Sequence, residues 1–290
     1  MAATVAFEYL EHLLTVPVRV AGIETRFILD TGIGPNLISA SLAEQAGCQP
    51  DGTTFTGHRM SGQAVTFPIG SVASLHLGAH RADRVPVGIF DMHAIAGLEG
   101  VAGFLSLTYF RTVPVTIDYA AGLVVLEDQQ SLALRAERGT CVAVQVRRDG
   151  CSTDLLLGME LPSGRAVTVE VDTGSDGIVL DESLAADVGV DLHHQSVRTQ
   201  AGTDETGYEF TRYFAPMSGD IAVTGASQFR MTAPEVMFQK IIHDGLVGDS
   251  FLRSFTTTYD LENARMIFSS PGRRPGRIPG HSWRPGSASR

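Results

Sequence analysis

The tripeptide Asp-Thr-Gly occurs twice in this sequence, each time at the end of a strand-like segment. The first copy, residues 30–32, follows the apolar run "FIL", and the second, residues 172–174, follows "VEV". A buried carboxylate without a partner is costly. A strand that ends in Asp therefore has two explanations. Either the backbone N–H groups of a turn solvate the charge, or a second carboxylate lies nearby and the two act together.

Three further segments repeat in the same order, which favours two related halves. Two of them keep the spacing of 142 residues that separates the two Asp residues. The third is shifted to 145, which predicts a three-residue insertion. The pairs are "SLAEQAG" (41–47) with "SLAADVG" (183–189), "VTIDYAAGLVVLE" (115–127) with "TTYDLENARMIFS" (257–269), and the shifted "GVAGFLSLTYF" (100–110) with "GLVGDSFLRSF" (245–255).

The composition is typical of a β-rich globular protein, with 43% apolar residues and 31 glycines in 290 residues. Strands are predicted at 13–20 and 23–29, around a turn at Ala21-Gly22. A short helix should follow each Asp-Thr-Gly turn. Ser41 and Glu44 have capping-box spacing for the first helix, which Gly47 ends. Asp181 and Gly189 should cap and end the second.

Hairpins are predicted within 53–90 and 195–240, and the repeated segments at 115–127 and 257–269 read as terminal hairpins. The expected organisation is two mainly β lobes, residues 10–130 and 131–270, joined by "SLALRAERG". Residues 271–290 are rich in Pro, Gly, Ser and Arg and predict a disordered basic tail.

Charge and residue usage exclude several classes of protein. The net charge of −10 argues against binding nucleic acid through phosphate contacts. No apolar run is long enough to span a membrane, and the first residues lack the features of a secretory signal, so we expect a cytoplasmic protein. Three cysteines without ligand spacing, and nine histidines without a metal motif, predict neither a disulfide framework nor a metal site, and no cofactor is expected.

These residues resemble the aspartic peptidases, in which an Asp-Thr-Gly turn is followed later in the same lobe by two apolar residues and a Gly. The second elements here would be Val101-Ala102-Gly103 and Leu246-Val247-Gly248. The short spacing looks closest to retroviral-type and bacterial retropepsin-like proteins, in a tandem single-chain form. The resemblance covers about residues 13–270. It implies a bilobal acid-protease fold, with two pseudo-twofold related, β-barrel-like lobes that each carry a short helix.

The resemblance also implies a site at the junction of the lobes. Asp30 and Asp172 would face each other as catalytic residues. Two carboxylates about 3 Å apart share one proton, so one acts as base and the other as acid on a bound water. The residues supporting the two turns would be Thr31 and Thr173, which bond into the opposite lobe, Gly32 and Gly174, which allow close approach, and Ser175.

The two turns differ at the next position, which is Ile33 in the first and Ser175 in the second. The Ser175 hydroxyl could bond the charged form of Asp172 and lower its pKa, whereas Ile33 can only desolvate Asp30. We therefore expect Asp30 to hold the shared proton more often. In that case Ser175→Ala should narrow the gap between the two limbs of the pH–rate profile.

Two glycine-containing hairpins are candidates for flaps that cover a substrate, at 58–65 and 199–210. The candidate substrate-binding residues in them are Ser61, Gly62, Gly202 and Tyr208. Tyr208 has the alternative of being ordinary sheet surface.

The predicted function is an aspartic endopeptidase that takes an extended polypeptide substrate and acts as a monomer, without nucleic acid or membrane partners. A second hypothesis is a catalytically inactive bilobal peptide-binding or inhibitor-like protein with the same fold. In a third, the Asp-Thr-Gly turns only organise a β-sandwich dimer. Retention of both Asp, both Thr and both Gly residues favours the first hypothesis.

Overall fold

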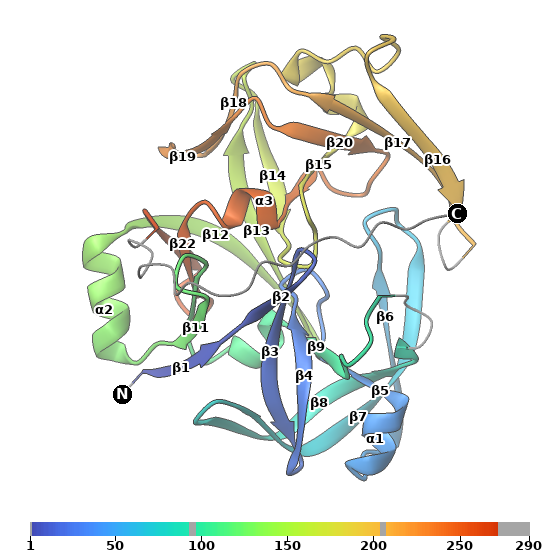
Figure 1. Ribbon diagram of the computed structural model, residues 1–290, viewed down its shortest axis with the longest axis vertical. Coiled ribbons are helices and arrows are strands. Elements are labelled where there is room, and N and C mark those ends of the chain that lie inside the picture. The colour runs from blue at the N-terminus through green and yellow to red at the C-terminus, as the bar shows by residue number, and fades with distance from the viewer. Residues whose placement is uncertain (1, 93–96, 204–206, 272–290) are drawn as a thin grey trace, which may run out of the picture.

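A computed structural model describes residues 2–92, 97–203 and 207–271 of the chain. Two large β-sheets dominate it, with a few short helices between strands. The mainly β, bilobal fold predicted above is confirmed (Figure 1). The predicted tail beyond Pro271 lies outside the described residues, as do residues 204–206 of the second flap candidate. None of the helices in the described ranges has the length and apolar character of a membrane span.

The first half of the chain forms an eight-stranded sheet, which is the blue-to-teal part of Figure 1. Strands β3 and β4 have the bounds that were predicted. The turn between them has positive φ at Ala21 (47°) and Gly22 (91°), as a tight two-residue hairpin requires. In sheet order the strands are β2 (Glu8–Leu10), β3 (Leu13–Val20), β4 (Ile23–Leu29), β9 (Gly103–Leu105), β5 (Leu37–Ser39), β8 (His80–Phe90), β7 (Ala64–Leu77) and β6 (Pro50–His58).

The second half forms most of a fifteen-stranded sheet, whose yellow and orange strands lie at the top of Figure 1. Its inner strands repeat the pattern of the first half, because β14 pairs in parallel with β21, just as β4 does with β9. The strands of this half are β12 (Thr140–Asp149), β13 (Ser152–Glu160), β14 (Ala166–Val171), β15 (Ile178–Asp181), β16 (Arg198–Thr203), β17 (Glu209–Pro216), β18 (Asp220–Val223), β19 (Ala226–Thr232), β20 (Glu235–Gln239), β21 (Gly245–Val247), β22 (Thr256–Asp260) and β23 (Arg265–Ser269).

The predicted terminal hairpins are present and join the two halves. They are β10 (Val115–Asp118) with β11 (Leu123–Leu126), and β22 with β23. Strands β10 and β22 pair antiparallel, so that Thr116 lies opposite its repeat counterpart Thr258, with 2.7 Å between the hydroxyl oxygens. Strand β1 (Ala3–Ala6) adds to β11 at one edge, and β12 adds to β23 at the other. The pairing of each Thr with its own counterpart places the pseudo-twofold axis here.

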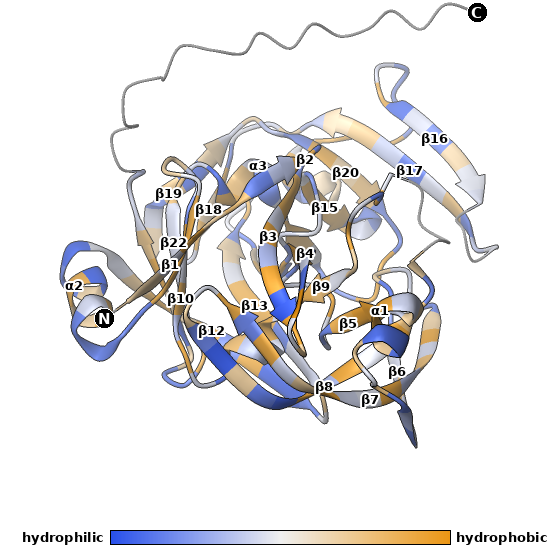
Figure 2. Cartoon of the chain, turned by 60° about the horizontal axis from the view of Figure 1, so that its bottom comes forward, coloured by the Kyte–Doolittle hydropathy of each residue, from blue (hydrophilic) through white to orange (hydrophobic). Residues whose placement is uncertain are grey.

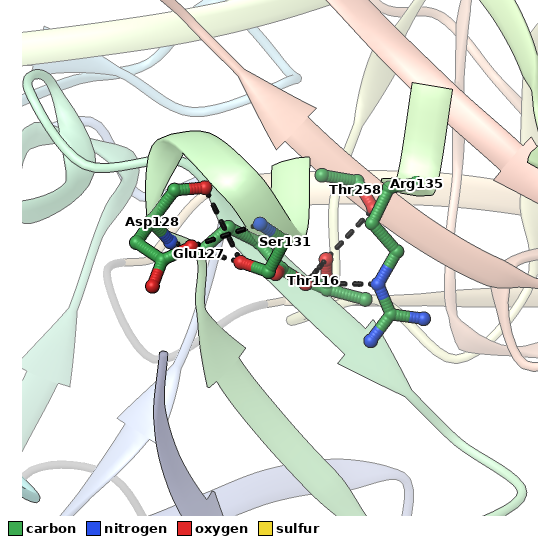
Figure 3. Close-up of polar contacts among 6 residues, drawn as sticks. All are labelled: Thr116, Glu127, Asp128, Ser131, Arg135 and Thr258. Atoms are coloured by element: carbon green, nitrogen blue, oxygen red, sulfur yellow. Dashed lines mark hydrogen bonds and ion pairs between the residues drawn. The ribbon is translucent and has the colours of Figure 1, made fainter. Parts of the chain in front are cut away.

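The segment between the halves is helix α2 (Gln129–Arg138), and it is anchored to this shared sheet. The side chain of Asp128 caps the helix by accepting from the Ser131 N–H. Beside it, the buried Glu127 carboxylate accepts hydrogen bonds from Thr116 (2.6 Å) and Arg135 (2.9 Å), as Figure 3 shows. The link is therefore attached to the axis between the halves. A lobe boundary near residue 130 stays a prediction.

The helix that follows the first Asp-Thr-Gly turn, α1 (Ala40–Gln45), begins two residues earlier than predicted. Its N-cap is Ser39, whose hydroxyl accepts from the Leu42 N–H, so the prediction of Ser41 was wrong. The reason is that α1 starts directly at the end of β5, which leaves Ser41 already inside the helix. In the second half Asp181 is a cap and Gly189 ends the segment with a φ of 72°. Between them, however, the chain forms two short 3₁₀ turns, η3 (Glu182–Leu184) and η4 (Ala186–Val188).

The core follows from the alternation of apolar and polar residues along the strands, visible as alternating colours in Figure 2. One large apolar core extends through both halves. A smaller group, which we call the first-half apolar cluster, lies beside it between β4, β5 and β7. Its buried members are Ile28, Leu37, Phe67, Ile69, Met92 and Phe104.

Candidate active site

The two Asp-Thr-Gly turns meet at the junction of the halves and are held by four hydrogen bonds, each of which involves Thr31 or Thr173. The Thr31 hydroxyl donates to the carbonyl of Val171 (2.6 Å) and accepts from the N–H of Thr173 (3.0 Å). The Thr173 hydroxyl donates to the carbonyl of Leu29 (2.7 Å) and accepts from the N–H of Thr31 (3.1 Å). Both threonines are buried. Each turn is therefore fixed by the opposite half of the chain.

These hydrogen bonds bring the carboxyl groups of Asp30 and Asp172 into hydrogen-bonding contact. Each also accepts from the backbone N–H two residues further on. These bonds are 2.9 Å long from Gly32 to Asp30 and 2.8 Å from Gly174 to Asp172. A Cβ at Gly32 would lie 2.5 Å from Asp172 Cγ, and one at Gly174 would lie 2.5 Å from Asp30 Oδ2. Only glycine leaves room for the opposite carboxyl group.

Burial and mutual repulsion alter the acidity of this pair of carboxyl groups. The pKa of Asp30 is raised well above its usual range, first because burial disfavours the charged form and then because Asp172 lies beside it. Burial also raises the pKa of Asp172, but the N–H groups of Gly174 and Ser175 oppose that rise. The shared proton therefore resides mainly on Asp30, which is the direction expected from the sequence.

The physical cause given above for this asymmetry was wrong. In the described part of the chain, the Ser175 backbone N–H donates to the backbone carbonyl of Asp172 (3.3 Å), and the Ser175 hydroxyl forms no hydrogen bond with Asp172. The N–H groups of Gly174 and Ser175 both lower the pKa of Asp172, while Ser175 itself lines a neighbouring cavity. Any residue at this position would supply the same donor.

The prediction for the apolar-apolar-Gly element of the first half was also wrong. Strand β9 pairs with β4 so that Leu105 lies opposite Leu29, and β21 pairs with β14 so that Val247 lies opposite Val171. The carbonyl of Leu105 accepts from the Asp30 N–H, and that of Val247 accepts from the Asp172 N–H, both at 3.0 Å. The counterpart of Leu246-Val247-Gly248 is therefore Phe104-Leu105-Ser106 and not Val101-Ala102-Gly103.

The spacing here is 142 residues as elsewhere, and the predicted three-residue insertion does not exist. Gly103 corresponds to Gly245. Both pack against a carbonyl oxygen of the next strand, that of Leu37 and that of Val179 respectively. The constant offset of the other repeats was the signal that could have identified this element.

A cavity of about 490 Å³ opens over the two carboxyl groups, and we call it the dyad cavity. Its roof is the end of β6 and the start of the following turn, from Phe55 to Met60. Ser61 and Gly62 lie at the tip of this hairpin and do not line the cavity. The tip nevertheless contacts the second half, because the Met60 carbonyl accepts from the Ile242 N–H (2.9 Å). The first flap candidate thus lies across the two carboxyl groups.

A second cavity of about 590 Å³ lies beside the second Asp-Thr-Gly turn, between that turn and β17, and we call it the β17 cavity. Arg212 and Phe214 of β17 line it together with Ser175. Met60 lines both cavities, so the two are neighbours beneath the tip of the hairpin. Gly202 and Tyr208 line neither cavity, so the structure does not bring them to the carboxyl groups.

Sequence reasoning missed a contact from the N-terminal hairpin to the second half. His12 Nε2 lies 3.3 Å from the Gly174 carbonyl oxygen, and the Tyr9 hydroxyl donates to the buried Asp249 (3.0 Å). It also missed Glu170, which lines the dyad cavity beside Asp172. In the ranges that the structure describes, no three His, Cys, Asp or Glu side chains are grouped so as to hold a metal ion.

Comparison with known proteins agrees with this geometry. The family profile described as aspartyl protease matches residues 16–161, half of the chain. The fold is similar to that of the aspartic proteinase from Irpex lacteus, with a TM-score of 0.58 and 12% identity over 95% of this chain and 99% of that one. It is also similar to basic 7S globulin from soybean, with a TM-score of 0.55 and 9% identity over 92% of this chain and 96% of that one.

A search of curated proteins finds no match. At such low identities the two solved structures show the fold alone, whereas the family profile extends over half of the sequence. The chain belongs to the aspartyl protease family.

Proposed function

We propose that this protein is an aspartic endopeptidase that hydrolyses peptide bonds with a water molecule activated between Asp30 and Asp172. The observation that carries the proposal is the contact between these two carboxyl groups. They come from equivalent turns, and each accepts only one short backbone hydrogen bond from its own turn. Both pKa values are raised by burial, and that of Asp30 is raised well above its usual range.

The chemistry follows from the unequal protonation. Asp172, which holds the shared proton less often, acts as the base that removes a proton from the water. Asp30 donates its proton to the carbonyl oxygen as the tetrahedral intermediate forms. When the intermediate collapses, Asp172 passes the proton taken from water to the leaving amine, and Asp30 recovers a proton from a hydroxyl of the intermediate. No covalent intermediate with the protein is required. The hydrogen bonds of Thr31 and Thr173 keep the two carboxyl groups in place, so that little reorganisation accompanies the reaction.

The substrate proposed is an extended polypeptide segment that passes through the dyad cavity and the β17 cavity beneath the β6–β7 hairpin. An extended segment can form backbone hydrogen bonds with the edge of a hairpin, which suits a strand-like substrate. We further propose that the protein is a tandem, retropepsin-like single chain that works as a monomer, because both turns of the site come from one chain.

An inactive peptide-binding protein with the same fold is the second candidate. This candidate is supported by the similarity to a protein described as a globulin. Because such a protein shares the fold, the fold alone does not decide whether a chain is a peptidase. The retention of two facing carboxyl groups argues against it. A binding protein gains nothing from them and bears the cost of their burial.

The test is cleavage of an unfolded protein and of a peptide library between pH 3 and 8, with and without pepstatin. We expect pepstatin-sensitive cleavage that falls by at least about a hundredfold in Asp30→Asn and in Asp172→Asn. The matched control is Asp83→Asn, which removes an acid from an exposed surface pair with Arg81 and should leave the rate unchanged. Cleavage that survives either dyad substitution in a folded chain would exclude this mechanism.

A further inference from the structure

Glu170 lies on β14 two residues before Asp172, so the two side chains share one face of the strand. Like Asp172, it lines the dyad cavity. Its repeat counterpart is Ile28, two residues before Asp30 on β4. The two equivalent strands therefore present a carboxyl group on one side of the dyad and an aliphatic side chain on the other.

The two sides of the dyad have opposite character. Ile28 is fully buried within the first-half apolar cluster, against which Ile33 and Phe55 also pack. Both of these partners line the dyad cavity and give its first-half side an apolar surface next to Asp30. On the second-half side, Glu170 is joined by Asp149 and Asp154. A peptide lying across the dyad would meet an apolar surface on one side of its scissile bond and acids on the other.

The carboxyl group of Glu170 has no internal partner. Among the residues that the structure describes, none forms a hydrogen bond or an ion pair with it. Burial raises its pKa to about 8, and the charges of Asp172 and Asp154 add to that effect, while Arg147 on β12 opposes it. The pKa of Asp30 is raised in turn by Glu170. The remaining charged or titratable groups on the cavity wall are His58, Arg59 and His243.

A half-buried carboxyl group without a partner is less stable in its charged form than an exposed one, and a cation that enters the cavity would offset that cost. A lysine or arginine side chain of a substrate can supply such a cation while its methylene groups lie along the cavity wall. In the first half, Ile28 is buried beneath the cavity wall, and Ile33 and Phe55, which pack against its cluster, offer a substrate apolar surface instead. The difference between the two repeats is therefore a difference in what each side of the site can bind.

We propose that Glu170 is the specificity-determining residue of the site and that it selects a cationic side chain, Lys or Arg, at one position next to the scissile bond. This inference deepens the proposed peptidase function and rests on it. Because a cation is attracted only by the charged form of Glu170, the preference should increase as the pH rises from 5 towards 8.

The experiment compares peptides that carry Lys, norleucine or Glu at each position flanking the scissile bond. Norleucine keeps the aliphatic chain of lysine and lacks its charge. At one position we expect kcat/KM for the Lys peptide to exceed that for the norleucine peptide by about tenfold or more, the value of a charge-assisted hydrogen bond. In Glu170→Gln and Glu170→Ile the ratio should fall to about one. Glu170→Asp should restore part of it.

The control variant is Glu160→Gln, which removes the same charge from an exposed position at the far end of β13 and should keep the ratio of the unaltered protein. Binding of the same peptides to the Asp30→Asn chain, measured by calorimetry, separates the two proposals. Preferential binding of Lys peptides to this variant, together with no cleavage of any peptide by the unaltered protein, would remove the peptidase function and leave the cation subsite. Dyad-dependent cleavage with the same Lys-to-norleucine ratio in the unaltered protein and in Glu170→Gln would overturn the role of Glu170.

Discussion

The turn that carries Asp30 and the turn that carries Asp172 make the same backbone contacts but have different neighbours. In each, the Asp N–H donates to a carbonyl of the adjacent parallel strand, and the Thr hydroxyl donates to the strand of the opposite half. These bonds agree in length to within a few tenths of an ångström. The two turns are equivalent because each is the other's binding partner, so a change in one would break bonds of both.

Away from that contact the halves differ. Ile28 corresponds to Glu170, Ser106 to Gly248, and the buried Leu107 to the buried Asp249. The Ser106 hydroxyl caps its own 3₁₀ turn, η2 (Leu107–Phe110), whereas Gly248 has no side chain with which to cap α3 (Asp249–Leu252). These positions lie outside the contact between the two turns, so that contact does not require them to match. The comparison shows that the junction conserves geometry while the flanks are free to acquire different chemistry.

The largest effect should come from breaking the equivalence at the junction. Thr31→Val and Thr173→Val each remove one donated and one accepted hydrogen bond and leave a buried N–H and a buried carbonyl without partners. We expect each variant to lower the free energy of unfolding by about 2–4 kcal/mol, to the same extent in both. Urea denaturation at fixed pH measures this. Clearly unequal losses would mean that the two turns are not equivalent.

An intermediate effect should follow from the difference between Ile28 and Glu170. The folded state binds the Glu170 proton more tightly than the unfolded state, because the pKa rises from the usual 4.5 to about 8. The stabilisation from this protonation is complete below about pH 4.5 and is lost as the pH rises towards 8. Glu170→Gln should therefore reduce the fall in stability across that range by up to about 1.4 kcal/mol per pH unit.

Unfolding measured in urea at pH 5, 6, 7 and 8 tests this. A decline with pH remains in the variant, since the raised pKa values of Asp30 and Asp172 act in the same direction. Glu160→Gln serves as the control, because its side chain is exposed at the strand end. Parallel curves for Glu170→Gln and the unaltered protein would show that Glu170 is charged in the folded state.

The smallest effect should come from Ser175. Since its backbone N–H and not its hydroxyl bonds Asp172, Ser175→Ala should leave both limbs of the pH–rate profile where they are. The profile of kcat/KM between pH 3 and 8 is the measurement. A shift of either limb in Ser175→Ala would restore a role for the hydroxyl and would make residues 33 and 175 a functional difference between the halves.

Several features could be predicted from local sequence because they depend on short-range physics. The bounds of β3 and β4 follow from alternating apolar residues and from Gly22 at the turn, which accepts positive φ. Asp181 and Gly189 have the side-chain and backbone properties that a helix cap and a helix stop need. The terminal hairpins at 115–126 and 256–269 were visible for the same reasons.

Features that depend on a distant partner could not be predicted in this way. Ser39 caps α1 because β5 ends there, and β5 ends where its pairing with β8 and β9 ends. Glu170 looked like one residue of a strand, and only the meeting of both halves encloses it in a cavity with Asp30 and Asp172. The flap candidates were chosen from glycines, whereas the cavity roof consists of Phe55 to Met60.

The sequence by itself determined that the chain contains two related halves, that each half is mainly β, and that an Asp-Thr-Gly turn ends a buried strand in both. These properties depend only on residue type and spacing. Only the tertiary structure decided how those turns meet, which atoms bond each carboxylate, and which side chains surround them. The reason is that the direction of an N–H group, the loss of solvent and the nearness of a second charge all depend on residues more than a hundred positions away.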